Sequence, residues 1–428
     1  MNEFNPERRR LIHAAGAAAL FSALPGAAFA AKGGKPVARV VVIGGGFGGA
    51  TAAKYLRLWS HGAIDVTLIE RNKQFISCPA SNEVLGGNRA YETLVHNYDG
   101  LKKKWGVKVV NASATSVDTE KRRVKTTAGE FAYDRLIVSP GIDFNFDSIQ
   151  GYDAKAQETV HHAWKAGPQT IALRKQLEAM PDGGVYILNC PTAPYRCPPG
   201  PYERISQIAY YFKTHKPKSK VLLLDANDKV ISKEKLFREV WANDYKDIIE
   251  YRPKWNVVAV DAANRTVTSE VGETERGDVL NLIPQQRGGT IAKDLGVLNV
   301  SNRWADVNWI TLESTAIPNV HLIGDVTQSA PQMPKSGHMA NNHGKAVAAA
   351  LIEIFAGREP KPTLMANTCY SLVDNLRGIH VASVHRYNPE KKLPIVEEGT
   401  SGVYKGPSVE EGVFTRNWAS TIWSDVLG

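Results

Sequence analysis

The chain has 428 residues, of which 43% are hydrophobic and 22% charged, and its formal net charge is +9 at pH 7. This composition excludes wholesale disorder, and the length predicts two or three domains. The positive charge is small for this size and its lysines are scattered, which argues against a nucleic-acid-binding role. Four cysteines without a C-x-x-C or C-x-x-C-H motif exclude a disulfide-stapled scaffold, a zinc ribbon and a standard c-type haem attachment, and we expect no metal site.

The N-terminus has the three-part pattern of an export signal. The twin-arginine run Glu7–His13 precedes the apolar stretch Ala14–Leu24, and Ala28-Phe29-Ala30 offers a cleavage site. Residues 1–30 are therefore predicted to be a Tat signal peptide that directs the protein to the periplasm, where disulfides persist. The alternative is an amphipathic helix or an anchor. No other segment approaches about 18 uninterrupted apolar residues, so no membrane span is expected.

A βαβ unit follows the signal. The apolar run Val37–Ile43 is typical of a buried parallel strand, and it leads directly into the glycine-rich turn Gly44–Gly49. Ala50–Trp59 is predicted as a helix, and Asp65–Ile69 as a second strand that ends at Glu70. A G-x-G-x-x-G turn between strand and helix, with an acid about twenty residues further on, predicts a dinucleotide site.

Each part of that turn has a physical task. Gly44 permits the tight turn, Gly46 lets a pyrophosphate approach the backbone, and Gly49 lets the helix pack closely on the strand. The helix N-terminus presents N–H groups to the phosphates, and Glu70 is suited to accept hydrogen bonds from a ribose. We assign the neighbouring Phe47 and Arg71 to the same cofactor site.

Two further segments indicate that the dinucleotide is FAD. Ile317–Val326 is predicted as a strand ending in Gly324-Asp325, with a helix over about His338–Phe355 after a Gly/Ser/Pro-rich turn. It resembles the second flavin motif of the glutathione-reductase superfamily, and that resemblance implies that Asp325 bonds the ribityl chain. Tyr133–Gly141 resembles the strand and turn by which such chains leave their FAD domain, ending in Ser-Pro-Gly at Gly141.

A second α/β unit lies between Gly141 and Gly277, with strands predicted at Gly184–Leu188 and Val221–Leu224 around a helix at Tyr202–Lys213. Its strand-to-helix turn is rich in proline and lacks the glycines that let a phosphate approach the backbone. We therefore expect no NAD(P)H site here, and electrons must enter from another donor.

These segments predict an α/β protein with two Rossmann-like domains of the glutathione-reductase type and a C-terminal α+β interface domain. The predicted parts are the FAD domain at 36–145 and 285–357, the second Rossmann-like domain at 146–284, and the C-terminal domain at 358–428. The last region is less regular in sequence, and its spaced aromatic residues suit a subunit interface, a lid or ordinary core packing.

The cysteines are the chemical candidates. Cys78 stands alone after the first βαβ unit, and Cys197 lies in the loop where a nicotinamide normally sits, so a disulfide to the distant Cys369 would face the flavin. A structural Cys190–Cys197 bridge that pins the proline-rich loop is the alternative.

The turn CPTAPYRCPPGPYER at 190–204, the lone Cys78 and the NTCYS segment around Cys369 resemble the flavoprotein subunit of flavocytochrome c sulfide dehydrogenase, a family related to the sulfide:quinone oxidoreductases. The resemblance covers essentially the whole mature chain. It implies FAD bound covalently through Cys78, a redox-active Cys197–Cys369 disulfide, Glu203 as an acid or base, and a separate c-type cytochrome subunit in a heterodimer. Glu203 is equally placed to cap its helix.

The expected activity is oxidation of sulfide to sulfane sulfur or polysulfide, with electrons passed to cytochrome c. Lys335, at the start of the helix after Asp325, is expected to stabilise a reduced flavin or else to lie in a solvated turn. The rival functions are a sulfide:quinone oxidoreductase, a type II NADH dehydrogenase, and a non-catalytic persulfide or flavin accessory protein.

Overall fold

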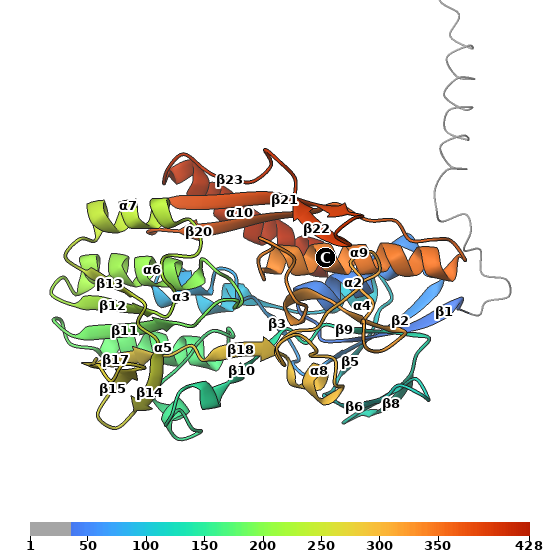
Figure 1. Cartoon of the computed structure of the whole chain (residues 1–428), viewed down its shortest axis with the longest axis horizontal. Coiled ribbons are helices and arrows are strands. Elements are labelled where there is room, and N and C mark those ends of the chain that lie inside the picture. The colour runs from blue at the N-terminus through green and yellow to red at the C-terminus, as the bar shows by residue number, and fades with distance from the viewer. Residues whose placement is uncertain (1–35) are drawn as a thin grey trace, which may run out of the picture.

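The computed structural model describes residues 36–428, and its first domain is built on a five-stranded parallel sheet (Figure 1). The predicted 1–30 signal lies outside the described residues. The sheet has the order β19-β9-β1-β2-β5, which comprises β1 (Ala38–Ile43), β2 (Ile64–Glu70), β5 (Lys108–Asn111), β9 (Arg135–Val138) and β19 (Val320–Leu322). The inner strands β1 and β9 are largely apolar because they are buried within the sheet.

Two helices pack against each other beside this sheet. The predicted helices at 50–59 and 338–355 are confirmed as α2 (Phe47–Trp59) and α9 (Gly337–Phe355). α2 begins three residues earlier than predicted, because Gly46 is its N-cap and the glycines of the turn form its first turn. A Cβ on Gly344 would lie 2.6 Å from the backbone oxygen of Gly48, so a glycine is required where the helices cross.

The remainder of the first domain consists of short elements. A three-stranded antiparallel sheet lies at its edge, and a two-stranded ribbon and short helices carry the segment around Cys78. These elements are β3 (Phe75–Ile76), α3 (Ser81–Leu85), η3 (Tyr91–Leu94), β4 (Val95–His96), α4 (Asp99–Lys103), β6 (Ala114–Asp118), β7 (Arg123–Thr126), β8 (Gly129–Ala132), α8 (Thr290–Asp294) and η6 (Gly324–Val326).

The second domain repeats the parallel arrangement with the order β13-β12-β11-β17. The predicted strands at 184–188 and 221–224 are confirmed as β11 (Val185–Cys190) and β12 (Lys220–Asp225), and the predicted helix as α6 (Gly200–His215). The antiparallel pair β10–β18 joins this domain to the first. The remaining elements are β10 (Ile142–Asn145), η4 (Phe146–Ser148), η5 (Ala156–Glu158), α5 (Pro168–Ala179), α7 (Glu234–Asp244), β13 (Ile249–Pro253), β14 (Val257–Asp261), β15 (Thr266–Ser269), β16 (Thr274–Arg276), β17 (Val279–Asn281) and β18 (Gln285–Gly288).

The C-terminal region is more regular than the sequence indicated. It forms the antiparallel sheet β20 (Met365–Leu372), β21 (Gly378–Asn388), β22 (Leu393–Val396) and β23 (Gly402–Val403), followed by α10 (Val409–Leu427). The predicted α+β composition of this region agrees with these elements, and its sequence pattern is weak because α10 mixes polar and apolar residues around its circumference. Figure 1 shows these elements lying across both other domains: β20 contacts α9 and α6, and α10 contacts α2 and α4.

Within residues 36–428, no helix has the length and apolar character that crossing a membrane requires.

Candidate active site

A cavity of about 670 Å³ lies where the three domains meet. Its walls come from the glycine turn before α2, the Cys78 segment, the turn before α6, and strand β20. All of the predicted site residues except Gly49 and Lys335 line it: Gly44, Gly46, Phe47, Glu70, Arg71, Cys78, Gly141, Cys197, Glu203, Gly324, Asp325 and Cys369.

The three glycines of the turn have different surroundings. Gly44 has φ +96°, and a Cβ there would lie 2.2 Å from the Ser139 backbone oxygen. A Cβ on Gly49 would lie 1.9 Å from the Gly44 backbone oxygen, whereas a Cβ on Gly46 would meet nothing within 4 Å. Gly44 and Gly49 are therefore required by backbone packing within the turn. Gly46 leaves open space on the cavity wall beside the first N–H groups of α2, and this space suits a pyrophosphate.

Glu70 is fixed at the end of β2. One carboxylate oxygen accepts from the Gly45 N–H at 2.6 Å and the other from the Asn72 N–H at 2.8 Å. The hydroxyl of Tyr98 donates to the Gly45 carbonyl at 3.0 Å and braces the same turn. The residues that are present thus fit the adenosine half of FAD.

Asp325 also lines the cavity, after Gly324, whose φ is +76°. Burial raises the pKa of the Asp325 carboxyl, and the positive charges of Arg196 and Lys335 oppose that rise. Gly141, with φ +67°, leaves further open space on the wall. These residues fit the ribityl and ring portion of a flavin.

Lys335 does not face the cavity, contrary to the prediction. Its ammonium lies 3.7 Å from the ring centre of Trp304 and donates to the backbone carbonyls of Asp325 and Thr327. Only 4% of the residue is exposed, so the solvated-turn alternative was also wrong, and burial lowers the pKa of the ammonium to about 7. The cations on the wall are instead Arg71, Lys165, Arg196 and Arg204.

Cys78 lies on the wall just before α3, and its sulfur accepts from the Ala166 N–H at 3.3 Å. The neighbouring Ser77 hydroxyl accepts from the indole N–H of Trp423 at 2.9 Å, which ties this segment to α10. The cysteine is unpaired and intermediate in exposure.

Cys197 and Cys369 come from different domains to the same cavity. Cys197 has φ +59°, its N–H donates to the Lys335 carbonyl at 2.8 Å, and its own carbonyl accepts from the Gly200 N–H. Cys369 lies within β20. Both are free thiols in this structure, and burial raises the pKa of both, to about 12 for Cys197.

Cys190 has a different environment. It is 1% exposed, and its sulfur lies 3.0 Å from the Tyr195 hydroxyl and 3.8 Å from that of Tyr202. It too is unpaired, and burial raises the pKa of its thiol. The structure therefore does not contain the alternative Cys190–Cys197 bridge, and it places Cys190 in the core.

Glu203 lies in the first turn of α6 but does not cap it. One carboxylate oxygen accepts from the Leu372 N–H of β20 at 2.9 Å, and the other from the side-chain amide of Asn82 at 2.8 Å. The capping alternative was wrong, because both acceptors are directed to other domains. Burial raises the pKa of the carboxyl, and these two donors oppose the rise.

Lys233 is a residue that sequence reasoning missed. It precedes α7 with φ +56°, and its ammonium donates to the Cys369 carbonyl at 2.9 Å and to the Ser371 hydroxyl at 2.7 Å. It is 6% exposed, and burial lowers its pKa to about 8. A lysine in a polar loop is usually exposed, so no sequence signal pointed to it.

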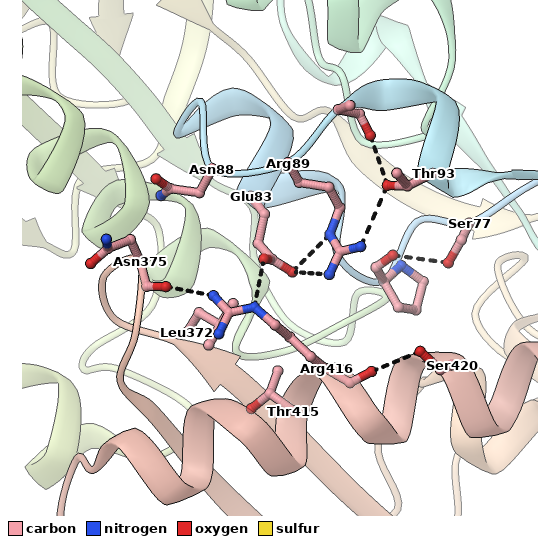
Figure 2. Close-up of polar contacts among 12 residues, drawn as sticks. Ser77, Glu83, Asn88, Arg89, Thr93, Leu372, Asn375, Thr415, Arg416 and Ser420 are labelled. Carbon is pink, nitrogen blue, oxygen red and sulfur yellow. Dashed lines mark hydrogen bonds and ion pairs between the residues drawn. The ribbon is translucent and has the colours of Figure 1, made fainter.

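A buried ion cluster holds the wall together (Figure 2). Glu83 of α3, which also lines the cavity, pairs with Arg89 at 3.0 Å and with Arg416 of α10 at 3.4 Å. Arg416 also donates to the Asn375 carbonyl at 2.6 Å. Because the Glu83 side chain is only 4% exposed, this cluster fixes α10 against the segment that carries Cys78.

The place of a second dinucleotide site is filled by tyrosines. Asp225, at the end of β12, corresponds in position to the ribose-binding acid of a Rossmann unit. It is 0% exposed and accepts from the hydroxyls of Tyr202 at 2.8 Å and Tyr251 at 3.1 Å. These contacts support the expectation that NAD(P)H does not bind there.

Comparison with known families gives two specific matches. The central domain of the sulfide dehydrogenase (flavocytochrome c) flavoprotein chain matches residues 170–284, and the flavin-binding domain of flavocytochrome c sulphide dehydrogenase matches residues 361–427. Two separate parts of the chain are thus similar to this flavoprotein family. Residues 38–178 match the pyridine nucleotide-disulphide oxidoreductase family, so the predicted Rossmann-type α/β class is confirmed.

Two curated relatives match parts of this flavoprotein. A type II NADH:quinone oxidoreductase of Staphylococcus haemolyticus is 32% identical over 114 residues, which is 26% of this chain and 28% of the relative. The mitochondrial sulfide:quinone oxidoreductase of Dictyostelium discoideum is 24% identical over 303 residues, 68% of this chain and 66% of the relative. The chain thus spans less than two thirds of either relative.

Solved structures share the fold. The sulfide:quinone oxidoreductase from Aquifex aeolicus superposes with a TM-score of 0.75 at 20% identity and covers 91% of both chains. An NAD-dependent persulfide reductase from A. fulgidus gives a TM-score of 0.64 at 16% identity over 90% of this chain and 77% of that chain.

Proposed function

We propose that this protein is an FAD-dependent sulfide dehydrogenase flavoprotein that oxidises sulfide to sulfane sulfur or polysulfide. The observation that carries the proposal is the meeting of Cys197 and Cys369, from two domains, on the wall of the flavin-binding cavity beside Glu203. The family match and the sulfide-oxidising relative from D. discoideum support the same reaction.

The chain's own residues supply the sulfur chemistry. In the oxidised protein, Cys197 and Cys369 form a disulfide, and hydrosulfide cleaves it by thiol–disulfide exchange. The ionised Glu203 carboxylate accepts the proton when H₂S enters, and its bonds to Leu372 and Asn82 hold it in place. FAD, when bound, supplies a two-electron acceptor next to the cysteines.

Cofactor attachment forms a second part of the proposal: Cys78 links FAD covalently through a thioether. Its position on the cavity wall, apart from the other three cysteines, supports this role. Acid precipitation tests it. Yellow colour must stay with the precipitated protein and move to the supernatant in Cys78→Ser, whereas colour in the supernatant of the unaltered protein refutes attachment.

The electron acceptor in this proposal is a c-type cytochrome subunit in a heterodimer, as the family match implies in general. Export of residues 31–428 by the Tat signal at 1–30 places the complex in the periplasm. The chain itself has no standard haem-attachment motif, so a second polypeptide carries the haem.

A quinone is the second candidate acceptor, and one observation favours it. The C-terminal domain exposes a set of apolar side chains that suits contact with a membrane surface: Leu376, Val403, Tyr404, Val409, Val413 and Phe414. Parallel assays with cytochrome c and with a short-chain ubiquinone distinguish the two. Turnover with the quinone alone would refute the cytochrome acceptor.

The reaction itself is tested by anaerobic titration of the purified protein with sulfide. We expect sulfide to bleach the flavin absorbance in the unaltered protein and in Cys190→Ser, the matched control, but not in Cys369→Ser. Flavin that stays oxidised under excess sulfide refutes the activity. Bleaching without turnover on either acceptor indicates an accessory protein rather than an enzyme.

A further inference from the structure

A buried lysine lies behind the two cysteines of the site. Lys233 does not line the cavity, yet its ammonium donates to the backbone carbonyl of Cys369 and to the hydroxyl of Ser371, two residues further along β20. The aromatic ring of Phe237 lies 5.5 Å from the same ammonium. Burying an ammonium with no carboxylate among its hydrogen-bond partners costs free energy, because the charge loses its hydration. A negative charge that forms nearby would offset this cost.

The surroundings of the two sulfurs are unequal. The side-chain amide of Asn367 donates to the Cys369 sulfur at 3.2 Å, and that amide is itself oriented by a hydrogen bond from the Ser336 hydroxyl at 2.7 Å. The Cys197 sulfur lies 3.0 Å from where a Cβ on Gly200 would be, against the start of α6. Within the described residues, Cys369 thus has an N–H donor to its sulfur and Cys197 has none.

From this asymmetry we infer that Cys369 is the leaving thiolate and that Cys197 carries the sulfane sulfur. Lys233 is the positioning residue that determines which of the two sulfurs leaves. The inference rests on the proposed sulfide oxidation. Hydrosulfide bonds to the Cys197 sulfur while the Cys197–Cys369 bond breaks. The products are a Cys197 persulfide, which retains the hydrosulfide proton, and a Cys369 thiolate, which takes the electron pair of the broken bond. The sulfide sulfur is oxidised and the disulfide is reduced.

The charges around Cys197 and Cys369 agree with Cys369 as the leaving thiolate. Burial raises the pKa of the Cys369 thiol, and Lys233 and then Asn367 oppose that rise most. Burial, Glu203 and Cys369 all raise the pKa of Cys197, against the weaker influence of Arg196 and Lys233. The better leaving group in thiol exchange is the sulfur with the lower pKa, which here is Cys369. Glu203 and Glu411 also face Lys233 and help to keep its ammonium charged.

The decisive experiment measures thiol reactivity in the holoprotein, without sulfide turnover. The protein is reduced with dithiothreitol, freed of reductant and treated with methyl methanethiolsulfonate between pH 6 and 10, and mass spectrometry locates the modified cysteine at each time. We expect Cys369 to react before Cys197. In Lys233→Met, the pH dependence of the rate of Cys369 modification should move to higher pH by about 1 to 2 units. This shift slows the modification of Cys369 roughly tenfold or more at pH 7.

Lys229→Met is the matched control, because it removes an exposed lysine from the same loop. It should leave both profiles unchanged. Asn367→Ala should shift the Cys369 profile in the same direction as Lys233→Met but less, and it provides a second test if the lysine variant does not fold.

A second readout locates the sulfane sulfur. After one anaerobic turnover with sulfide, alkylation and peptide mass spectrometry should find the extra sulfur atom on Cys197. Extra sulfur on Cys369, Cys197 reacting first in the unaltered protein, or an unchanged Cys369 profile in Lys233→Met overturns the inference. A failed sulfide titration with Cys369 still reacting first would instead refute the proposed function and leave the thiolate asymmetry standing.

Discussion

Two alanine substitutions in one glycine turn should separate cofactor binding from folding. Gly46 has φ −73°, which alanine adopts without strain, and a methyl group there meets nothing within 4 Å. Gly46→Ala should therefore fold, and the apoprotein should gain about 0.4 to 1 kcal/mol because alanine restricts the unfolded chain. The methyl group instead occupies the open space that we assign to the pyrophosphate.

The loss of cofactor affinity follows from that obstruction. Displacing the pyrophosphate by the radius of a methyl group removes one charged hydrogen bond, worth about 1.5 to 3 kcal/mol. FAD affinity should fall about 10- to 100-fold. The measurement is FAD binding to apoprotein in a Cys78→Ser background, so that attachment does not mask affinity.

Gly49→Ala is the contrasting variant. A methyl group there would lie 1.9 Å from the Gly44 backbone oxygen, so the start of α2 must move away from β1. Overpacking typically costs about 1 to 3 kcal/mol, and unfolding in urea should show a loss at the upper end of that range even without FAD. FAD affinity unchanged in Gly46→Ala, or wild-type stability in Gly49→Ala, would refute the roles assigned to these glycines.

Three further predictions concern the charged groups and the core cysteine. Glu203→Gln should lower the rate of flavin reduction by sulfide roughly 100-fold or more. Burial raises the Glu203 pKa, so the wild-type rate at constant H₂S concentration should decline, as pH falls, through a pKa above the ordinary 4.5, and the variant should lack this decline. Arg416→Met should destabilise the protein by about 1 to 3 kcal/mol in urea because Glu83 is buried, while Arg386→Met, which removes an exposed pair, should cost less than about 1 kcal/mol; equal losses would contradict the role of the cluster. Cys190 should resist methyl methanethiolsulfonate in native protein at pH 8, and its modification at the rate of the cavity cysteines would contradict its placement in the core.

Local patterns were predictable because their causes are local. The strand at 38–43, the glycine turn and the helix at 47–59 were expected within a few residues, since a buried parallel strand, a pyrophosphate turn and a helix start each impose requirements on neighbouring residues. The family resemblance came from three similarly short segments, the turn at 190–204, Cys78 and the residues around Cys369, and the comparisons confirm it.

Side-chain direction was less predictable. Lys335 follows Asp325 closely in sequence, yet its ammonium lies over Trp304 instead of the cavity. The sequence also left Glu203 as either a helix cap or an acid, and only the approach of β20, which brings the Leu372 N–H to its carboxylate, excludes the cap. In both cases the deciding partner belongs to a segment remote in sequence.

The sequence by itself determined where a dinucleotide can bind, that the second Rossmann turn is unsuited to one, and which four cysteines are available. Tertiary structure alone decided that Cys197 and Cys369 share a wall, that Cys190 is enclosed, and that Lys233 lies behind Cys369. The physical reason is that backbone requirements extend over a few residues, whereas burial and the charges that set thiol reactivity depend on how three domains pack together.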